Sequence, residues 1–124
     1  MTSYTITKYQ YYEYSLDDYN NIRHAFFEIY ADHDATPASV LIAGLGILKL
    51  LEEELGKVKD GESVLIGQDN HQFILRFFKR QIQDLNEDIK QGFNPEWYFE
   101  MRKWIKDFSQ VHEVLSKKIP HIEK

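Results

Sequence analysis

Apolar side chains recur at three- and four-residue spacing along most of this chain, and this periodicity constrains the fold more than any other feature. Such spacing places the apolar side chains on one face of an α-helix. We expect four helices of similar length, over residues 16–33, 37–56, 70–91 and 95–118. Each helix has an apolar stripe that must be buried against a neighbouring element.

Residues that favour helix ends stand at the boundaries of these segments. Ser15 precedes the first helix and Asp18 occupies its third position, which is the pattern of a capping box. Pro37 and Pro95 stand at first helical positions, where the missing N–H costs nothing. Gly92 follows the third helix, where a left-handed C-cap is expected.

The connections between the expected helices are short, long and short. Short connections join antiparallel neighbours, so the first two helices form one hairpin and the last two form another. The sequence therefore predicts an all-α protein, an antiparallel four-helix bundle in which residues 1–124 form a single domain.

The first fourteen residues differ in kind, because tyrosines stand there in a mostly alternating pattern that is typical of a strand. We expect a tyrosine-rich extended arm that lies along the bundle, or else a strand that pairs with residues 64–66. Tyrosine has a large apolar body and a polar tip, which suits a protein interface. The candidate interface residues in this segment are Tyr9, Tyr11, Tyr12 and Tyr14.

Residues 39–55 form the least polar stretch of the chain and contain Gly44 and Gly46. The third position of a dinucleotide-binding Gly-x-Gly-x-x-Gly motif is Lys49, and the Gly-Lys-Ser/Thr ending of a P-loop is absent. The apolar run is also too short to span a membrane. The two glycines therefore indicate close helix packing.

Almost every position from 40 to 51 is apolar, so the helix over 37–56 has no clean polar face. A helix that is apolar all round is buried on more than one side. The second side requires cover from the N-terminal arm, from the loop over 57–68 or from a second copy of the chain. We expect a homodimer through this helix, with Gly44 and Gly46 in the interface.

Two histidines, His71 and His112, are expected at the same end of the bundle, near the acidic end of the second helix that includes Glu53. Imidazole and carboxylate groups from facing helices bind zinc or iron. However, the paired Glu-x-x-His motifs of a di-iron bundle are missing. His24 and Glu28 stand four residues apart on the side opposite the first apolar stripe, and we expect a solvated pair there.

Basic and aromatic residues alternate in RFFKRQ, residues 76–81, and in MRKWIK, residues 101–106. Single-strand nucleic-acid binders use such a pattern. Here the aromatic residues Phe77, Phe78 and Trp104 fall on inward stripes, and the chain has a net charge of −5. We therefore expect core rings and solvated basic faces, and we do not expect nucleic-acid binding.

The chain has no cysteine, and its first residues lack the pattern of a signal peptide, so a cytoplasmic location is expected. No cofactor and no membrane partner are expected. The sequence favours a small acidic protein-binding or regulatory protein without catalytic activity, such as an adaptor, an inhibitor or an immunity-type protein. One alternative is a metal-dependent helical-bundle enzyme that uses His71 and His112, and a second is a nucleic-acid-binding accessory protein.

Overall fold

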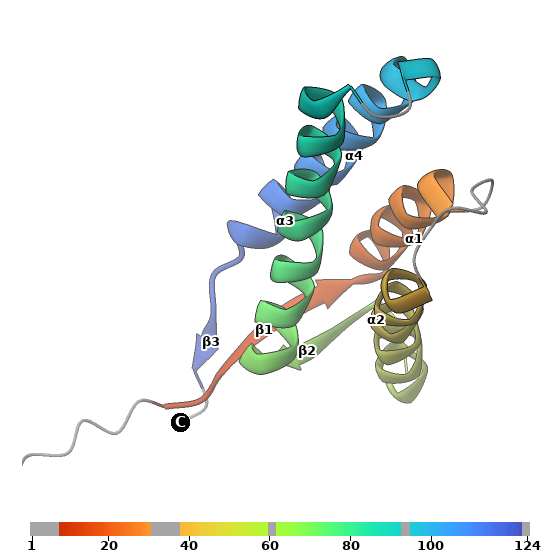
Figure 1. The fold of residues 1–124 in the computed structure, drawn as a ribbon. Coiled ribbons are helices and arrows are strands. Elements are labelled where there is room, and N and C mark those ends of the chain that lie inside the picture. The colour runs from red at the N-terminus through yellow and green to blue at the C-terminus, as the bar shows by residue number, and fades with distance from the viewer. Residues whose placement is uncertain (1–7, 31–37, 60–61, 93–94, 123–124) are drawn as a thin grey trace, which may run out of the picture.

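The computed structural model describes residues 8–30, 38–59, 62–92 and 95–122, and this part of the chain is mostly helical (Figure 1). Its α-helices are α1 (Leu16–Tyr30), α2 (Ala38–Lys57), α3 (Gln68–Gln91) and α4 (Tyr98–Ser116). A single 3-10 turn, η1 (Pro95–Trp97), precedes α4. The strands are β1 (Gln10–Ser15), β2 (Ser63–Gly67) and β3 (His121–Ile122).

The helices occupy the segments that the apolar periodicity predicts, and a mostly helical chain is confirmed. The all-α class holds only broadly, because the described chain also has a small sheet. Residues 31–37 lie outside the described residues, and so do the predicted end of the first helix and the Pro37 start of the second.

Two helix ends follow the caps that the sequence predicts, whereas Pro95 opens η1 and α4 begins three residues later, at Tyr98. The Ser15 amide donates to Asp18 Oδ2 at 2.8 Å, and the Asp18 amide donates to Ser15 Oγ at 3.1 Å. This reciprocal pair is a capping box that starts α1. Gly92 ends α3 with a φ of 73°, and its amide donates to the carbonyls of Asp88 and Ile89. Both predicted caps are confirmed.

The sheet has the order β2-β1-β3, and β1 is antiparallel to both of its neighbours. Tyr12 is opposite Ile66 and Tyr14 is opposite Val64. Of the two arrangements that the sequence allows for the tyrosine-rich segment, residues 10–15 adopt the strand pairing. Residues 1–7 of the expected arm lie outside the described residues.

The helices α3 and α4 run side by side in opposite directions, and α1 packs against both α2 and α4 (Figure 1). The core lies between these helices and the inner face of the sheet, and its fully buried members include Tyr14, Leu51, Ile74, Phe78 and Phe108. One face of the α3–α4 hairpin is thereby turned away from α1 and α2 (Figure 1). Among the described helices, none combines the length and the apolarity that are needed to cross a membrane.

Candidate functional site

A groove of about 550 Å³ runs along the outer face of the α3–α4 hairpin. Leu75 and Ile82 form its floor, and both also pack against the core. Its other lining residues are Arg76, Lys79, Gln83, His112 and Ser116. The groove therefore combines an aliphatic floor with a polar and cationic rim.

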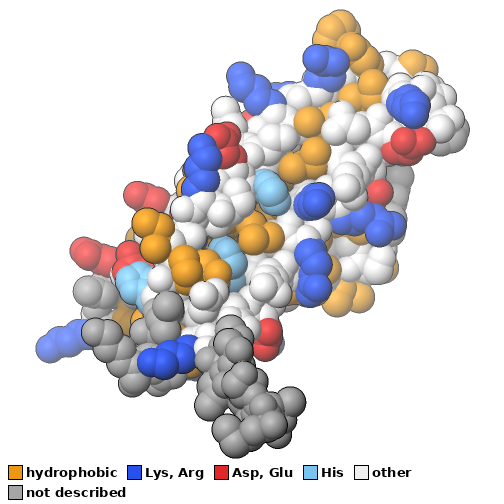
Figure 2. All heavy atoms as spheres, turned by 90° about the vertical axis from the view of Figure 1, so that its left-hand side faces the viewer, with side chains coloured by type: hydrophobic (Ala, Val, Ile, Leu, Met, Phe, Trp, Pro, Cys, Tyr) orange, Lys and Arg blue, Asp and Glu red, His pale blue; other side chains and the backbone are white. Residues whose placement is uncertain are grey.

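Each of the two helices borders the groove with a face that carries no carboxylate. On α3 this face follows the helical spacing through Gln68, Gln72, Leu75, Lys79, Ile82 and Asn86. On α4 it follows the same spacing through Arg102, Ile105, Ser109, His112 and Ser116. Figure 2 views the molecule from this side: Lys and Arg side chains flank exposed hydrophobic and histidine side chains, and acidic groups lie mostly toward the edges.

The charge on this face is not neutralised from within the described chain. Arg76 and Lys79 are exposed, and neither forms an ion pair with another described residue. Arg80, by contrast, binds Asp84 Oδ1 at 3.2 Å on the other flank of α3. Arg80 is therefore paired, whereas Arg76 and Lys79 leave the groove side positive.

Of the two histidines proposed as metal ligands, His71 lies in the core and His112 lines the groove. His71 Nδ1 is 2.8 Å from the Tyr14 hydroxyl, and its ring stacks on Tyr12 with centroids 3.7 Å apart. Burial, assisted by the nearby Lys118 ammonium, lowers the pKa of His71 from 6.5 to about 4. His71 is therefore a neutral core residue at physiological pH.

Within the described residues, no three His, Asp or Glu side chains form a cluster that could hold a metal ion. The predicted set of His71, His112 and Glu53 is accordingly not such a cluster. Glu53 is exposed on α2 and lies 4.0 Å from Lys49. The expected convergence fails because the Tyr14 hydroxyl engages His71 inside the core while His112 faces the outer groove.

The four candidate interface tyrosines differ in burial, because successive side chains of β1 point to opposite faces of the sheet. Tyr14 is completely buried, and burial raises the pKa of its hydroxyl. Tyr12 is half-buried against His71. Tyr9 is 39% exposed and its hydroxyl lies 3.4 Å from Asp69 Oδ2, while Tyr11 meets the Tyr9 ring edge-on at 5.1 Å. Of these four tyrosines, Tyr9 is exposed, Tyr11 and Tyr12 are half-buried, and Tyr14 is buried.

The glycines Gly44 and Gly46 of α2 also differ in their surroundings. Gly44 is buried beneath the Phe26 ring of α1, so it serves close helix packing within the chain. Gly46 is exposed, and a Cβ added at this position would meet no other atom within 4 Å. Beside it, Ile42 is 71% exposed and Leu45 is 49% exposed. The outer side of α2 therefore stays apolar over this stretch.

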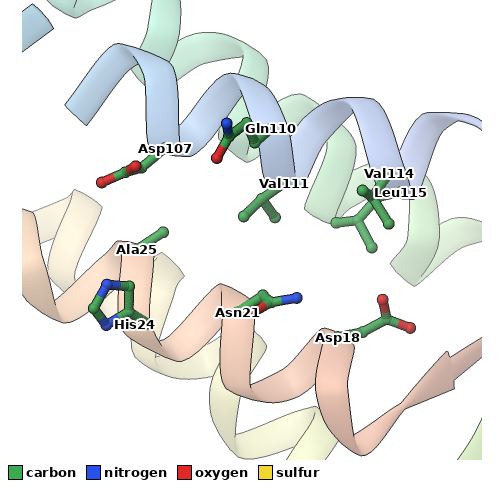
Figure 3. Close-up of a pocket in the computed structure, with 9 residues that line it drawn as sticks. All are labelled: Asp18, Asn21, His24, Ala25, Asp107, Gln110, Val111, Val114 and Leu115. Carbon is green, nitrogen blue, oxygen red and sulfur yellow. The ribbon is translucent and has the colours of Figure 1, made fainter. Parts of the chain in front are cut away.

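A second groove, of about 290 Å³, lies between α1 and α4 (Figure 3). Asp18, Asn21, His24 and Ala25 come from α1, and five residues of α4 face them: Asp107, Gln110, Val111, Val114 and Leu115. Its polar groups are already engaged at both ends. Asp18 Oδ2 accepts from Lys118 Nζ at 2.8 Å, and Asp107 is hydrogen-bonded to Glu28.

The Glu28 carboxylate links the two helices beside this groove. Lys103 Nζ donates to Glu28 Oε1, and His24 Nε2 lies 3.3 Å from Glu28 Oε2. The hydrogen bond from Lys103 lowers the pKa of Glu28, whereas burial and the hydrogen bond with Glu28 raise the pKa of Asp107. The predicted His24–Glu28 pair is present and His24 is exposed, but α4 partly covers Glu28 and supplies two further partners, Lys103 and Asp107.

Both basic-aromatic segments contribute to the outer face of the hairpin. Phe77, Phe78 and Trp104 are buried, as the sequence predicts. Arg76 and Lys79 of the first segment line the groove, and Arg102 of the second lies farther along the α4 face that carries His112. Neither basic-aromatic segment alone predicts the groove. The sequence feature that indicates it is a face without Asp or Glu on each helix. These two faces point to a common surface only when α3 and α4 are known to pack side by side.

No protein-family model, no curated protein and no solved structure matches this chain.

Proposed function

We propose that this protein is a non-enzymatic protein-binding or regulatory protein, and that the outer α3–α4 groove is its docking surface. The observation that carries the proposal is the groove itself, with an aliphatic floor between two faces that lack carboxylates. Exposed apolar surface bordered by polar groups is typical of a protein-binding site. We further propose that the four helices form one antiparallel bundle. We also propose a cytoplasmic location, which suits a chain without cysteine.

Site-specific photocrosslinking in the cells that express the protein tests this proposal. A photoreactive amino acid at position 79 faces the groove, whereas the same group at position 80 lies on the other flank of α3. We expect a discrete protein adduct from position 79 and not from position 80. The partner, identified by mass spectrometry and purified, should bind the wild-type chain and bind the Lys79→Gln variant more weakly. Equal adducts from both positions would contradict docking through the groove.

We also propose that a second copy of the chain covers the outer side of α2. Ile42 and Leu45 are exposed there, and Gly46 has open space above it. A two-fold axis near residues 45 and 46 places Leu45 of each copy over Gly46 of the other, so that one patch is complementary to itself. An exposed glycine within a helix lowers helix stability by about 1 kcal/mol relative to alanine. The absence of a side chain at Gly46 would allow a second helix to approach closely.

A further inference from the structure

The floor and the rim of the α3–α4 groove place different demands on an occupant. Leu75 and Ile82 are partly buried against the core and present their remaining apolar surface to the groove. Arg76 and Lys79 stand beside them without an ion pair in the described part of the chain. An occupant must therefore supply apolar side chains and negative charge along the same segment.

The shape of the groove favours a helical occupant. The groove lies between two antiparallel helices, and a third helix packs into such a furrow at an interaxial distance of about 8–10 Å. The lining runs from Leu75 to Gln83 on α3, about 12 Å of helix, and His112 and Ser116 border it from α4. Two to three turns of an occupant helix can place apolar residues on this floor and acidic residues on the rim.

A nucleic acid would supply the negative charge that the rim requires but not the apolar side chains that the floor requires. Its phosphates would pair with the cations, but binding of single strands also needs exposed aromatic rings on which bases stack. Among the described residues that line the groove, none is Phe, Tyr or Trp, and the exposed rings of Phe73, Trp97 and Phe99 lie outside it. The aliphatic floor would be left against a charged backbone.

We propose that the α3–α4 groove binds an amphipathic α-helix of a partner protein whose polar face carries carboxylates. This inference rests on the proposed docking function and adds the chemistry of the partner. Leu75 and Ile82 receive its apolar side chains, and Arg76 and Lys79 receive its acidic side chains.

Fluorescence anisotropy with a synthetic peptide tests the inference on the full chain. The probe is a labelled helical peptide of about 20 residues with leucines at positions i, i+3, i+4 and i+7 and with glutamates on the other face. Two control peptides have lysine in place of every glutamate, or the same composition in an order that scatters the leucines. An RNA oligonucleotide of similar net charge is the fourth probe. We expect saturable binding of the acidic amphipathic peptide alone.

Adjacent residues of α3 provide a matched pair of protein variants. Lys79→Gln and Arg80→Gln each remove one exposed positive charge from the same helix, but only Lys79 lines the groove. We expect Lys79→Gln to weaken peptide binding about tenfold and Arg80→Gln to change it little. Far-ultraviolet circular dichroism of both variants checks that the helices are retained.

The outcomes separate the chemistry of the partner from the docking function. Failure of the acidic peptide to bind, equal binding of the lysine peptide, or equal effects of the two variants would overturn the helix proposal. Tighter binding of the RNA would assign the face to nucleic acid and overturn it as well. If photocrosslinking from position 79 nevertheless identifies a partner, docking through the groove stands and only the proposed chemistry of the partner is wrong.

Discussion

Gly44 and Gly46 stand two positions apart in α2 but have opposite surroundings. A Cβ at position 44 would lie 1.9 Å from Phe26 Cε2, inside the core, whereas a Cβ at position 46 would meet nothing within 4 Å. We expect Gly44→Ala to lower the free energy of unfolding by about 2 kcal/mol, because the buried ring cannot move away without strain. We expect Gly46→Ala to raise it by about 0.5–1 kcal/mol through helix propensity.

Urea unfolding at low micromolar protein concentration measures both values, under conditions where association through α2 contributes least. Equal effects of the two substitutions would contradict the packing of Phe26 against Gly44.

His71 makes the stability of the fold depend on pH. Its pKa is about 4 in the folded chain, against 6.5 for an ordinary histidine, so the unfolded chain takes up the proton first as the pH falls. The stabilisation is fully present above pH 6.5 and is lost as the pH falls from 6.5 toward 4. Between pH 7.5 and pH 5 we expect this residue to account for a loss of about 2 kcal/mol.

Unfolding curves of the wild-type chain and of His71→Gln at the two pH values isolate this contribution. Glutamine keeps a polar group toward Tyr14 but does not titrate, so its stability should fall less over the same interval. A parallel loss of stability in both proteins would assign the pH dependence to other groups.

At the scale of elements, Gly92 connects the end of α3 to the start of the hairpin with α4. Its φ of 73° lies in the left-handed region, where a side chain is strained, and its amide caps two carbonyls of α3. We expect Gly92→Ala to lower the free energy of unfolding by about 1 kcal/mol. Gly92→Asn should cost less, because asparagine tolerates this conformation. Thermal unfolding of the two variants provides the comparison, and an equal loss in both would argue against strain.

The helices were predictable because their signals are local. Caps such as Ser15 with Asp18, and stripes at helical spacing, are complete within each segment. The sheet was only partly predictable, because β1 becomes a strand by pairing with β2 about fifty residues later in the chain. The two residues of β3 follow Pro120 and form a strand only against the edge of β1. The sequence of a strand does not by itself identify the strand with which it pairs.

The candidate sites depend even more on the relative placement of helices. Glu28 belongs to the outer side of α1 when α1 is considered alone, and α4 turns it into an interhelical contact. The spacing of His71 and His112 predicts similar levels along the hairpin, but rotation about the helix axes sends one inward and the other to the groove. Sequence spacing fixes the level of a residue along its helix and leaves its direction to packing.

At the scale of the whole molecule, the net charge of −5 describes no individual surface. The α3–α4 groove lies between carboxylate-free faces, while α2 carries Glu52, Glu53 and Glu54 at its C-terminal end. In Figure 1, α2 and the outer face of the hairpin lie on different sides of the molecule. A second copy on α2 would therefore leave both grooves of a dimer open, and two grooves on one particle would strengthen binding to a partner that has two acidic helices.

The dimer is testable with a matched pair of isoleucines. Ile42 is 71% exposed on the outer side of α2, and Ile119 is 83% exposed in the segment between α4 and β3. We expect the wild-type chain to sediment as a concentration-dependent dimer in analytical ultracentrifugation. Ile42→Lys should shift it to the monomer, because charge would be buried against Leu45 and its own symmetry mate, while Ile119→Lys should leave the dimer intact. A monomeric wild-type chain at high concentration, or equal effects of the two substitutions, would remove α2 as the dimer interface and leave the single groove to act alone.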